Sequence, residues 1–255
     1  MGDLSINLFA LADFPLVQPG DDLAVLIAAS LEANHVTLEA GDIVVIAQKV
    51  VSKAENCFRD LAQITPTAEA KTLAAKADKD PRMIEAILAE SNEVVRVVPG
   101  VVIVESRLGL VHANAGIDQS NVSHDQMAEP ILLLPEDPDR SAVVIRDYLQ
   151  GDLASLGVVI SDSVGRAWRN GTTGLAIGCA GLEALCDLRG ENDLFGRVLE
   201  VTEIGFADEV ASAASLLMGQ ADEAVPVVIL RGLDFPTSEQ GVGSLLRDKT
   251  KDLFR

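Results

Sequence analysis

Two short apolar runs constrain the fold of this chain more than any other feature. Residues 42–47 read DIVVIA, and residues 156–160 read LGVVI. Runs rich in β-branched residues and bounded by turn or polar residues are typical of buried strands. Further strands are predicted within residues 94–106, 108–116 and 225–233. The chain therefore builds at least part of its core around a sheet.

Helical segments separate these strands without a regular alternation. Residues 20–34 predict a helix capped by Asp21 or Asp22, and residues 65–96 predict two helices divided near Asp80 and Pro81. Residues 142–155 and the first part of 207–224 also favour helices. This mixture predicts an α+β fold of mixed sheets with helices. With 255 residues, 48% of them hydrophobic, the chain can fill one large core or two smaller ones. We expect a single domain over residues 1–255, and a subdomain boundary near residue 135 or 210 stays open.

The charge of the chain limits its partners. A formal net charge of −19 argues against nucleic acid or an anionic membrane surface. A phosphorylated substrate would be repelled unless local Lys and Arg residues or divalent cations offset the charge. The three cysteines form no CxxC pair, and no basic leader precedes the first apolar residues. These features predict a soluble protein of the cytoplasm.

Oxygen-rich side chains follow two of the predicted strands. The stretch AGIDQSN supplies Asp118, Ser120 and Asn121, and VVISDS supplies Asp162 and Ser163 in the turn that we expect there. Hard cations such as Mg²⁺ prefer carboxylate, hydroxyl and amide oxygens. The alternative is that both aspartates only cap turns through their side chains. Two such groups near basic residues keep a metal site open as a hypothesis.

Basic residues accompany both groups. Lys49 and Lys53 are four apart at the predicted end of the first strand, and Arg166 and Arg169 flank the only tryptophan, Trp168. The lysines are candidates for binding an anion, although exposed lysines are more often solvated surface. The two arginines are candidates for clamping an anionic substrate, or they stack on the indole ring. Neither GxxxxGK[ST] nor a GxGxxG motif that opens a helix is present.

Several long stretches together resemble one known family. GDIVVIAQKVVSKAEN, GLVHANAGIDQSNV, VVISDSVGRAWRNGTTGLAIGCAG and LLMGQADEAVPVVILRG occur in this order over nearly the whole chain. They resemble the coenzyme F-420-0:L-glutamate ligases, also called γ-glutamyl ligases. The resemblance implies a GTP-dependent amide ligase of coenzyme F-420 biosynthesis, which joins L-glutamate to the lactyl-phosphate end of a deazaflavin precursor. It also implies Mg²⁺ or Mn²⁺, allows K⁺, and suggests an intertwined homodimer with an uncommon α+β fold.

The resemblance also assigns roles to residues of this sequence. The metal ligands that it implies are Asp118, Asp162, Ser163 and Gln220. The nucleotide contacts that it implies are Phe14, Pro15, Leu16, Val17, Gln48, Lys49, Lys53, Asn121, Met218, Gly219, Gln220, Ala221, Asp222, Glu223, Ala224 and Val225. Asn56 departs from the pattern, since many relatives have Gly there.

Three alternatives to the ligase stay open. The first is a ligase of the same scaffold for another amino acid and another phosphorylated acid. The others are a nucleotide-binding regulatory protein without chemistry and a metal-dependent phosphohydrolase.

Overall fold

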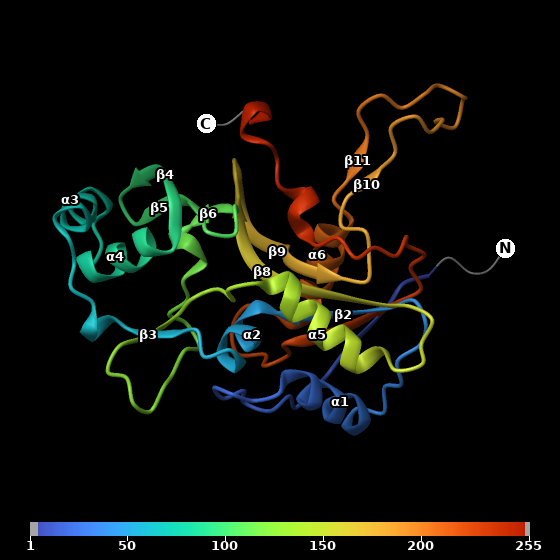
Figure 1. Cartoon of the computed structure of the whole chain (residues 1–255), viewed down its shortest axis with the longest axis horizontal. Coiled ribbons are helices and arrows are strands. Elements are labelled where there is room, and N and C mark those ends of the chain that lie inside the picture. The colour runs from blue at the N-terminus through green and yellow to red at the C-terminus, as the bar shows by residue number, and fades with distance from the viewer. Residues whose placement is uncertain (1–4, 253–255) are drawn as a thin grey trace.

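A five-stranded mixed sheet forms the centre of the computed structural model, which describes residues 5–252 (Figure 1). Both ends of the expected domain, residues 1–4 and 253–255, lie outside the described residues. The strand order is β1-β12-β2-β8-β9. The strands are β1 (Asn7–Ala10), β12 (Val227–Arg231), β2 (Asp42–Ala47), β8 (Leu156–Arg166) and β9 (Arg169–Ala180). β2 and β8 run parallel with Val45 opposite Val159, whereas the other neighbouring pairs are antiparallel.

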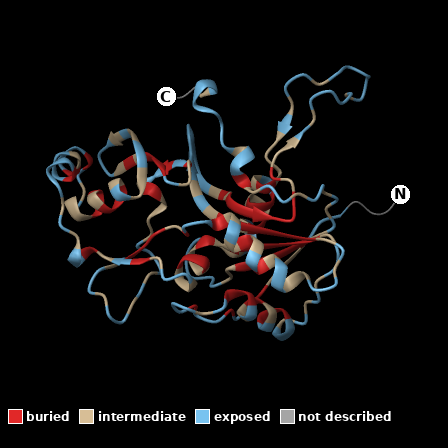
Figure 2. Cartoon of the chain, in the orientation of Figure 1, coloured by how far each residue is buried: buried red, intermediate tan, exposed pale blue. Residues whose placement is uncertain are grey.

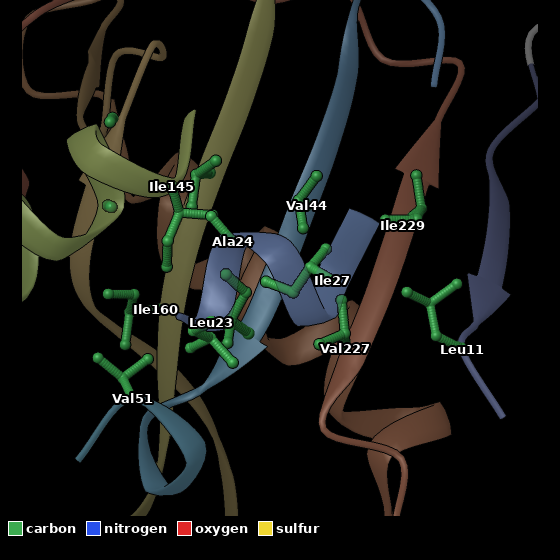
Figure 3. Packing of buried hydrophobic residues seen from close by; sticks show 14 of the residues in the cluster. Leu11, Leu23, Ala24, Ile27, Val44, Val51, Ile145, Ile160, Val227 and Ile229 are labelled. Atoms are coloured by element: carbon green, nitrogen blue, oxygen red, sulfur yellow. The ribbon is translucent and has the colours of Figure 1, made fainter. Parts of the chain in front are cut away.

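Helices cover both faces of this sheet. On one face, α1 (Leu23–Ala33), α2 (Gln48–Ala54) and α5 (Pro138–Gln150) bury Ile27, Val51 and Ile145 against Val44 and Ile160, as Figure 3 shows. On the other face, α6 (Phe206–Met218) packs with the short helix η3 (Val242–Leu245). Strands covered on both faces must be apolar throughout, which explains the unbroken hydrophobic runs of β2 and β8.

Side-chain caps set where the helices begin. Asp22 accepts hydrogen bonds from the amides of Ala24 and Val25, and Asp80 accepts one from Arg82. The helix predicted over residues 142–155 in fact spans Pro138–Gln150, so its predicted start and end are wrong. Asp137 caps it by accepting from the Arg140 amide, and Pro138 fits the first turn because it has no N–H that needs a partner. The acidic stretch around Asp137 thus contains a helix start that apolar periodicity does not reveal.

Glycine lets α6 lie directly against β9. A Cβ atom on Gly174 would come within 2.3 Å of the Ala211 carbonyl oxygen in α6. This close approach shows that the backbones of α6 and β9 meet at Gly174. We expect Gly174→Ala to lower the free energy of unfolding by about 1–3 kcal/mol, because helix and strand must move apart. Gly165→Ala, in the same hairpin with nothing within 4 Å of the added carbon, should change it by less than about 0.5 kcal/mol. Chemical denaturation measures both, and equal effects would contradict this account.

A separate hydrophobic cluster lies beside the central sheet, at the left of Figure 1. Its elements are α3 (Ala68–Ala77), α4 (Pro81–Ala89), β4 (Ser91–Val98), β5 (Val101–Ser106), β6 (Val111–Ala113) and η2 (Asn114–Gly116). The pair β3 (Phe58–Asp60) and β7 (Pro130–Leu132), with η1 (Leu61–Gln63), joins it to the centre. Figure 2 shows its buried residues as a group apart from those of the sheet.

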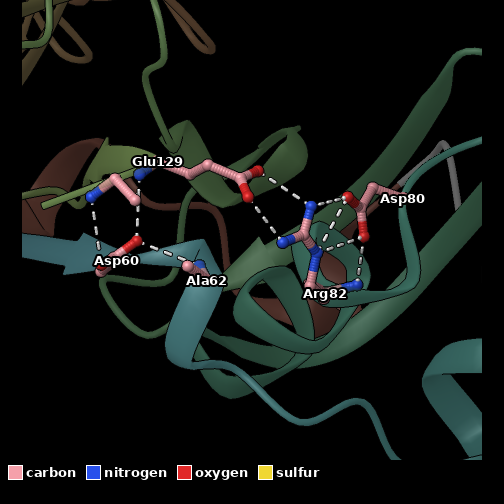
Figure 4. A network of polar contacts seen from close by, with 6 residues as sticks. Asp60, Ala62, Asp80, Arg82 and Glu129 are labelled. Carbon is pink, nitrogen blue, oxygen red and sulfur yellow. Dashed lines mark hydrogen bonds and ion pairs between the residues drawn. The ribbon is translucent and has the colours of Figure 1, made fainter.

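An ion-pair network anchors the loop that leads from Asp118 to β7. Arg82 donates to both carboxylate oxygens of Glu129 at 2.9 Å, and it also pairs with Asp80 (Figure 4). Asp60 accepts from the backbone amides of Ala128 and Glu129. The end of this loop is therefore held to α4 and β3 by charged groups.

An exposed arm projects from the other side of the sheet. Its paired strands are β10 (Cys186–Asp187) and β11 (Glu203–Ile204), seen at the upper right of Figure 1. Leu194 and Phe195 at its tip are 92% and 90% exposed. The last described helix is η4 (Lys249–Lys251), where Lys249 pairs with Glu93 and with the buried Glu105. Across residues 5–252, no helix is both long and apolar enough to cross a membrane.

The structure confirms the predicted α+β class with mixed sheets and helices. The single domain, its subdomain boundary and the intertwined homodimer stay predictions.

Candidate active site

A cavity of about 620 Å³ opens at the carboxyl ends of the parallel strands β2 and β8. In sheets with parallel strands, this edge is where ligands commonly bind. The cavity is lined by every metal and nucleotide residue named above: Phe14, Pro15, Leu16, Val17, Gln48, Lys49, Lys53, Asp118, Asn121, Asp162, Ser163 and the loop from Met218 to Val225. The structure therefore brings together side chains that are as much as 211 positions apart in the sequence, from Phe14 to Val225.

Two local predictions about these residues are wrong. Asp162 and Ser163 lie within β8 rather than in a turn after it, because β8 continues to Arg166 in a hairpin with β9. Lys49 and Lys53 lie on α2, which begins directly where β2 ends. Residues four apart on a helix share one face, so both ammonium groups can line the same cavity. No glycine or proline separates β2 from α2, so the sequence does not reveal where the strand ends and the helix begins.

Asp118 is held by contacts from far along the chain. Its Oδ2 accepts a hydrogen bond from Gln48 Nε2 at 2.7 Å, and its Oδ1 lies 3.4 Å from Lys49 Nζ. Gln48 is itself buried and accepts from the Ser52 hydroxyl at 2.9 Å. These contacts bind the Asp118 carboxylate across the cavity, whereas a turn cap would use its neighbouring amides.

The second carboxylate, Asp162, faces the same groups. Its Oδ1 accepts from the Ser163 backbone amide at 2.7 Å. Burial first, and then the nearby Asp118 carboxylate, raise the pKa of Asp162 to about 6, against the opposing effects of the Ser163 amide, Lys49 and a hydrogen bond from Gln48. Burial also raises the pKa of Asp118. Burial makes it unfavourable for both neighbouring carboxylates to be ionised, and a bound cation would offset their negative charge.

The stability that the protein loses by burying the ionised Asp162 carboxylate can be measured without any ligand. Asp162 holds its proton to a higher pH when folded than when unfolded, so it lowers stability as the pH rises from about 4 through 6. In metal-free protein, we expect Asp162→Asn to raise the free energy of unfolding at pH 7 by on the order of 2 kcal/mol. At pH 4, where the native carboxyl is protonated, the variant and the wild type should be equally stable. Urea unfolding with a chelator present measures both, and equal stability at pH 7 would contradict the expectation.

The two lysines supply the positive charge of the cavity. Lys49 Nζ donates to the Ser120 carbonyl oxygen at 3.1 Å besides its pair with Asp118. Lys53 is half-buried; burial lowers its pKa and the Lys49 charge lowers it further, while Asp118 opposes both. Neither lysine is therefore simply solvated surface, as the alternative interpretation supposed.

The backbone conformation just after α2 explains why asparagine can stand at position 56 in place of glycine. Asn56 adopts φ +57°, in the left-handed region that glycine favours and asparagine tolerates. The backbone geometry that glycine would provide is therefore available to this chain.

The loop after α6 closes another side of the cavity. Asn121 Nδ2 donates to the Ala221 carbonyl oxygen at 2.8 Å, which joins the Asp118 loop to this one. The Glu223 carboxylate accepts from the Ala221 amide at 2.8 Å, and backbone amides of this loop lower its pKa. Because Glu223 already occupies these amides, the loop is poorly suited to cradle a phosphate, and the lysines are better placed to do so.

Ser120, named from the sequence as an oxygen ligand beside Asp118, also borders the cavity. Three other serines of the lining, Ser123, Ser161 and Ser215, were not named from the sequence. Ser161 precedes Asp162 in the same strand, so nearness to the aspartate was the available signal. Ser215 lies on α6, and no local pattern marks it.

The structure does not place Arg166 and Arg169 in this lining. Both lie at the far end of the β8–β9 hairpin, on either side of the turn that contains Trp168. A larger cavity of about 950 Å³ lies elsewhere, against α1 and α5. Its lining contains six acidic residues and a single arginine, Arg140, and none of the predicted site residues. The smaller cavity is therefore the candidate active site.

The donor set of the cavity suits a hard cation. Among residues 5–252, no group of three or more His, Cys, Asp or Glu side chains gathers to hold a metal. Asp118 and Asp162 with the Ser163 hydroxyl instead resemble the sites of Mg²⁺, which takes one or two carboxylates and completes its shell with water and substrate phosphates. A metal here would depend on a phosphorylated ligand.

The fold and the site together are typical of an enzyme, because carboxylates, hydroxyls and lysines gather at the carboxyl ends of parallel strands. A family model described as F420-0:Gamma-glutamyl ligase matches residues 12–232. The chain is similar to the coenzyme F420:L-glutamate ligase of Methanothermobacter thermautotrophicus, with 47% identity over 99% of this chain and 100% of the relative. The ligases of the same name from Methanopyrus kandleri and Archaeoglobus fulgidus are 47% and 39% identical, over 94% and 99% of this chain and 93% and 97% of their own lengths. The chain belongs to the F420-0:gamma-glutamyl ligase family.

Proposed function

We propose that this protein is a GTP-dependent ligase that joins L-glutamate to the deazaflavin coenzyme F420-0 through an amide bond. The observation that carries the proposal is the shared cavity, which gathers the metal and nucleotide residues of the family resemblance from five separate segments. The names of relatives at 39–47% identity over nearly the whole chain support the acceptor and the amino acid.

The proposed chemistry begins with phosphoryl transfer. A carboxylate is a poor electrophile, so an oxygen of the acceptor carboxylate attacks the γ-phosphorus of GTP, the bond to the β-phosphate oxygen breaks, and GDP leaves. Such a transfer needs positioning and neutralisation of charge more than a protein nucleophile. Lys49 and Lys53 supply positive charge from one wall of the cavity.

Asp118 and Asp162, with Ser163 and Gln220, would hold Mg²⁺ or Mn²⁺ at the same place. Bound there, the cation would help to neutralise the negative charge of the phosphates and of the acceptor carboxylate. A monovalent K⁺ stays a prediction of the family resemblance. The amine of L-glutamate then attacks the acyl phosphate, the amide forms, and inorganic phosphate and a proton leave.

An omission assay tests this function. Purified protein is given GTP, Mn²⁺ or Mg²⁺, F420-0 and L-glutamate, with one component left out each time, and product mass and GDP are measured. We expect product only from the complete mixture. Product with another amino acid would favour the same-scaffold ligase, and phosphate release without glutamate would favour the phosphohydrolase. Tight GTP binding with no turnover in any mixture would favour the regulatory protein.

We further propose that the chain works as a homodimer in the cytoplasm. The apolar arm tip supports the dimer because Leu194 and Phe195 are adjacent and both exposed, and contiguous apolar patches mark protein contacts. Light scattering after gel filtration gives the assembly mass directly, and a monomeric mass at micromolar concentration would contradict it.

A further inference from the structure

The hairpin of β8 and β9 continues beyond the sheet that carries it. β2 pairs with β8 only as far as Ala47 opposite Ser161, whereas β8 and β9 remain paired out to Arg166 opposite Arg169. Figure 1 shows this two-stranded ribbon extending past the other strands. Its base lines the candidate active site through Ser161, Asp162 and Ser163. At about 3.3 Å per residue, the tip lies some 13 Å along the strand from Asp162.

The tip of this ribbon has an unusual composition for its position. Trp168 is 80% exposed, although it is the only tryptophan of the chain, and it adopts φ +56°. A bulky residue in the left-handed region is an outlier, and such outliers concentrate where a function requires them. Burial does not explain this residue, since most of its ring faces solvent.

Two guanidinium groups accompany the ring. Arg166 Nη2 donates to the Asn170 carbonyl oxygen at 2.9 Å, which holds that side chain along the ribbon. Arg169 is the cross-strand partner of Arg166, so both arginines flank the same turn. In a chain of net charge −19, two cations beside an exposed indole form a local exception to the acidic surface.

We propose that this ribbon tip, Arg166, Trp168 and Arg169, binds the part of the deazaflavin acceptor that lies away from the reacting carboxylate. The arginines take the phosphodiester, and the indole stacks on the planar ring system. The inference rests on the proposed function, since it needs an acceptor that carries a carboxylate, a phosphodiester and a flat ring in one extended molecule.

The chemistry of the tip matches this ligand better than it matches GTP. Guanidinium forks bind phosphate oxygens with two parallel hydrogen bonds. An indole offers a flat apolar face to a conjugated ring, and such pairs prefer offset stacking. With the acceptor carboxylate near Asp162, the ribbon extends in one direction from the reacting centre, so an elongated acceptor can lie along it. The residues assigned to GTP line the cavity at the base instead.

Kinetics of a double variant test the arginines. We expect R166A/R169A to raise the KM for F420-0 at least tenfold, while the KM values for GTP and glutamate stay within twofold. R166K/R169K keeps the charge but loses the planar guanidinium fork. Its KM for F420-0 should lie between those of the wild type and R166A/R169A. Arg96→Ala on β4 is the matched control, since it also removes an exposed guanidinium, and it should leave all three KM values unchanged.

Fluorescence of the single tryptophan tests the stacking without turnover. Trp168 should be open to acrylamide in the free protein, and its bimolecular quenching constant, obtained from lifetimes, should fall at least twofold with saturating F420-0. GTP alone should leave that constant unchanged, and R166A/R169A should need a higher F420-0 concentration for the same protection.

The outcomes separate this inference from the function on which it rests. Absence of glutamate-dependent product from the wild-type protein would overturn the proposed ligase. Wild-type turnover with an unchanged acceptor KM in R166A/R169A, or Trp168 equally quenched with and without F420-0, would overturn the ribbon tip alone. A rise in the GTP KM in place of the acceptor KM would also overturn it.

Discussion

Asp162→Asn and Asp118→Asn are each expected to abolish ligase turnover while the protein stays folded. Each change keeps the shape of the side chain but removes a negative ligand from the proposed cation site. The loss weakens cation binding and the neutralisation of charge during phosphoryl transfer together. We expect at least a thousandfold fall in kcat/KM, which corresponds to about 4 kcal/mol in the barrier. Steady-state product formation at saturating Mn²⁺ measures it, with circular dichroism as the check on folding.

A carboxylate outside the cavity provides the control for this experiment. Burial also raises the pKa of Asp208 on α6, and this carboxylate accepts from the Ala176 amide at 2.9 Å. Asp208→Asn keeps an acceptor oxygen for that bond, so turnover should stay within about threefold, or less than ~1 kcal/mol. Native circular dichroism with turnover within threefold in either cavity variant would show that the metal assignment is wrong.

Lys53→Ala is expected to raise the KM for GTP tenfold or more, about 1.4 kcal/mol of lost binding. The half-buried ammonium borders the cavity beside Lys49, where nucleotide phosphates would lie. Lys53→Arg should restore only part of the affinity, since a planar fork replaces a compact charge poorly in a confined site. The KM for glutamate should change little, because that substrate would occupy another part of the site.

Two further variants make the lysine experiment specific. Lys71→Ala removes an exposed ammonium from α3, well away from the cavity lining, and should leave GTP kinetics unchanged. A kcat that falls with an unchanged GTP KM would indicate an interaction made only in the transition state. Wild-type GTP kinetics in Lys53→Ala at saturating metal would remove this residue from the nucleotide site.

The sequence predicts the secondary structure best where the pattern is purely local. The cap at Asp22 and the break at Asp80 and Pro81 lie where they were expected, because a capping side chain acts within two or three residues. The start of α5 at Pro138 was missed, since acidic residues and prolines also suit a loop. The boundary between β2 and α2 was missed because Gln48 and Lys49 follow the strand directly, with no glycine or proline to mark a turn.

Local sequence patterns likewise predict some residues of the candidate site and not others. Asp118 and Asp162 could be singled out because each stands near a predicted strand among other oxygen groups. That Gln48 joins them could not be derived from local patterns, since its contact with Asp118 spans 70 positions and Asp118 is itself held opposite Leu132 of β7. The family resemblance supplied Gln48, and the three-dimensional structure supplies the physical reason for it.

The irregular pairing within the β8–β9 hairpin has a consequence for how such chains can change in length. Between Ile160 and Ser161 the register shifts, with Ile177 as the extra residue on β9. A one-residue insertion between Leu156 and Asp162 would turn every later side chain to the opposite face, and it would carry the Asp162 carboxylate away from Gln48. The β10–β11 arm is not paired with the central sheet, so an insertion there leaves the register of β8 unchanged. Insertions and deletions in related chains should therefore collect in the arm and spare the first half of β8.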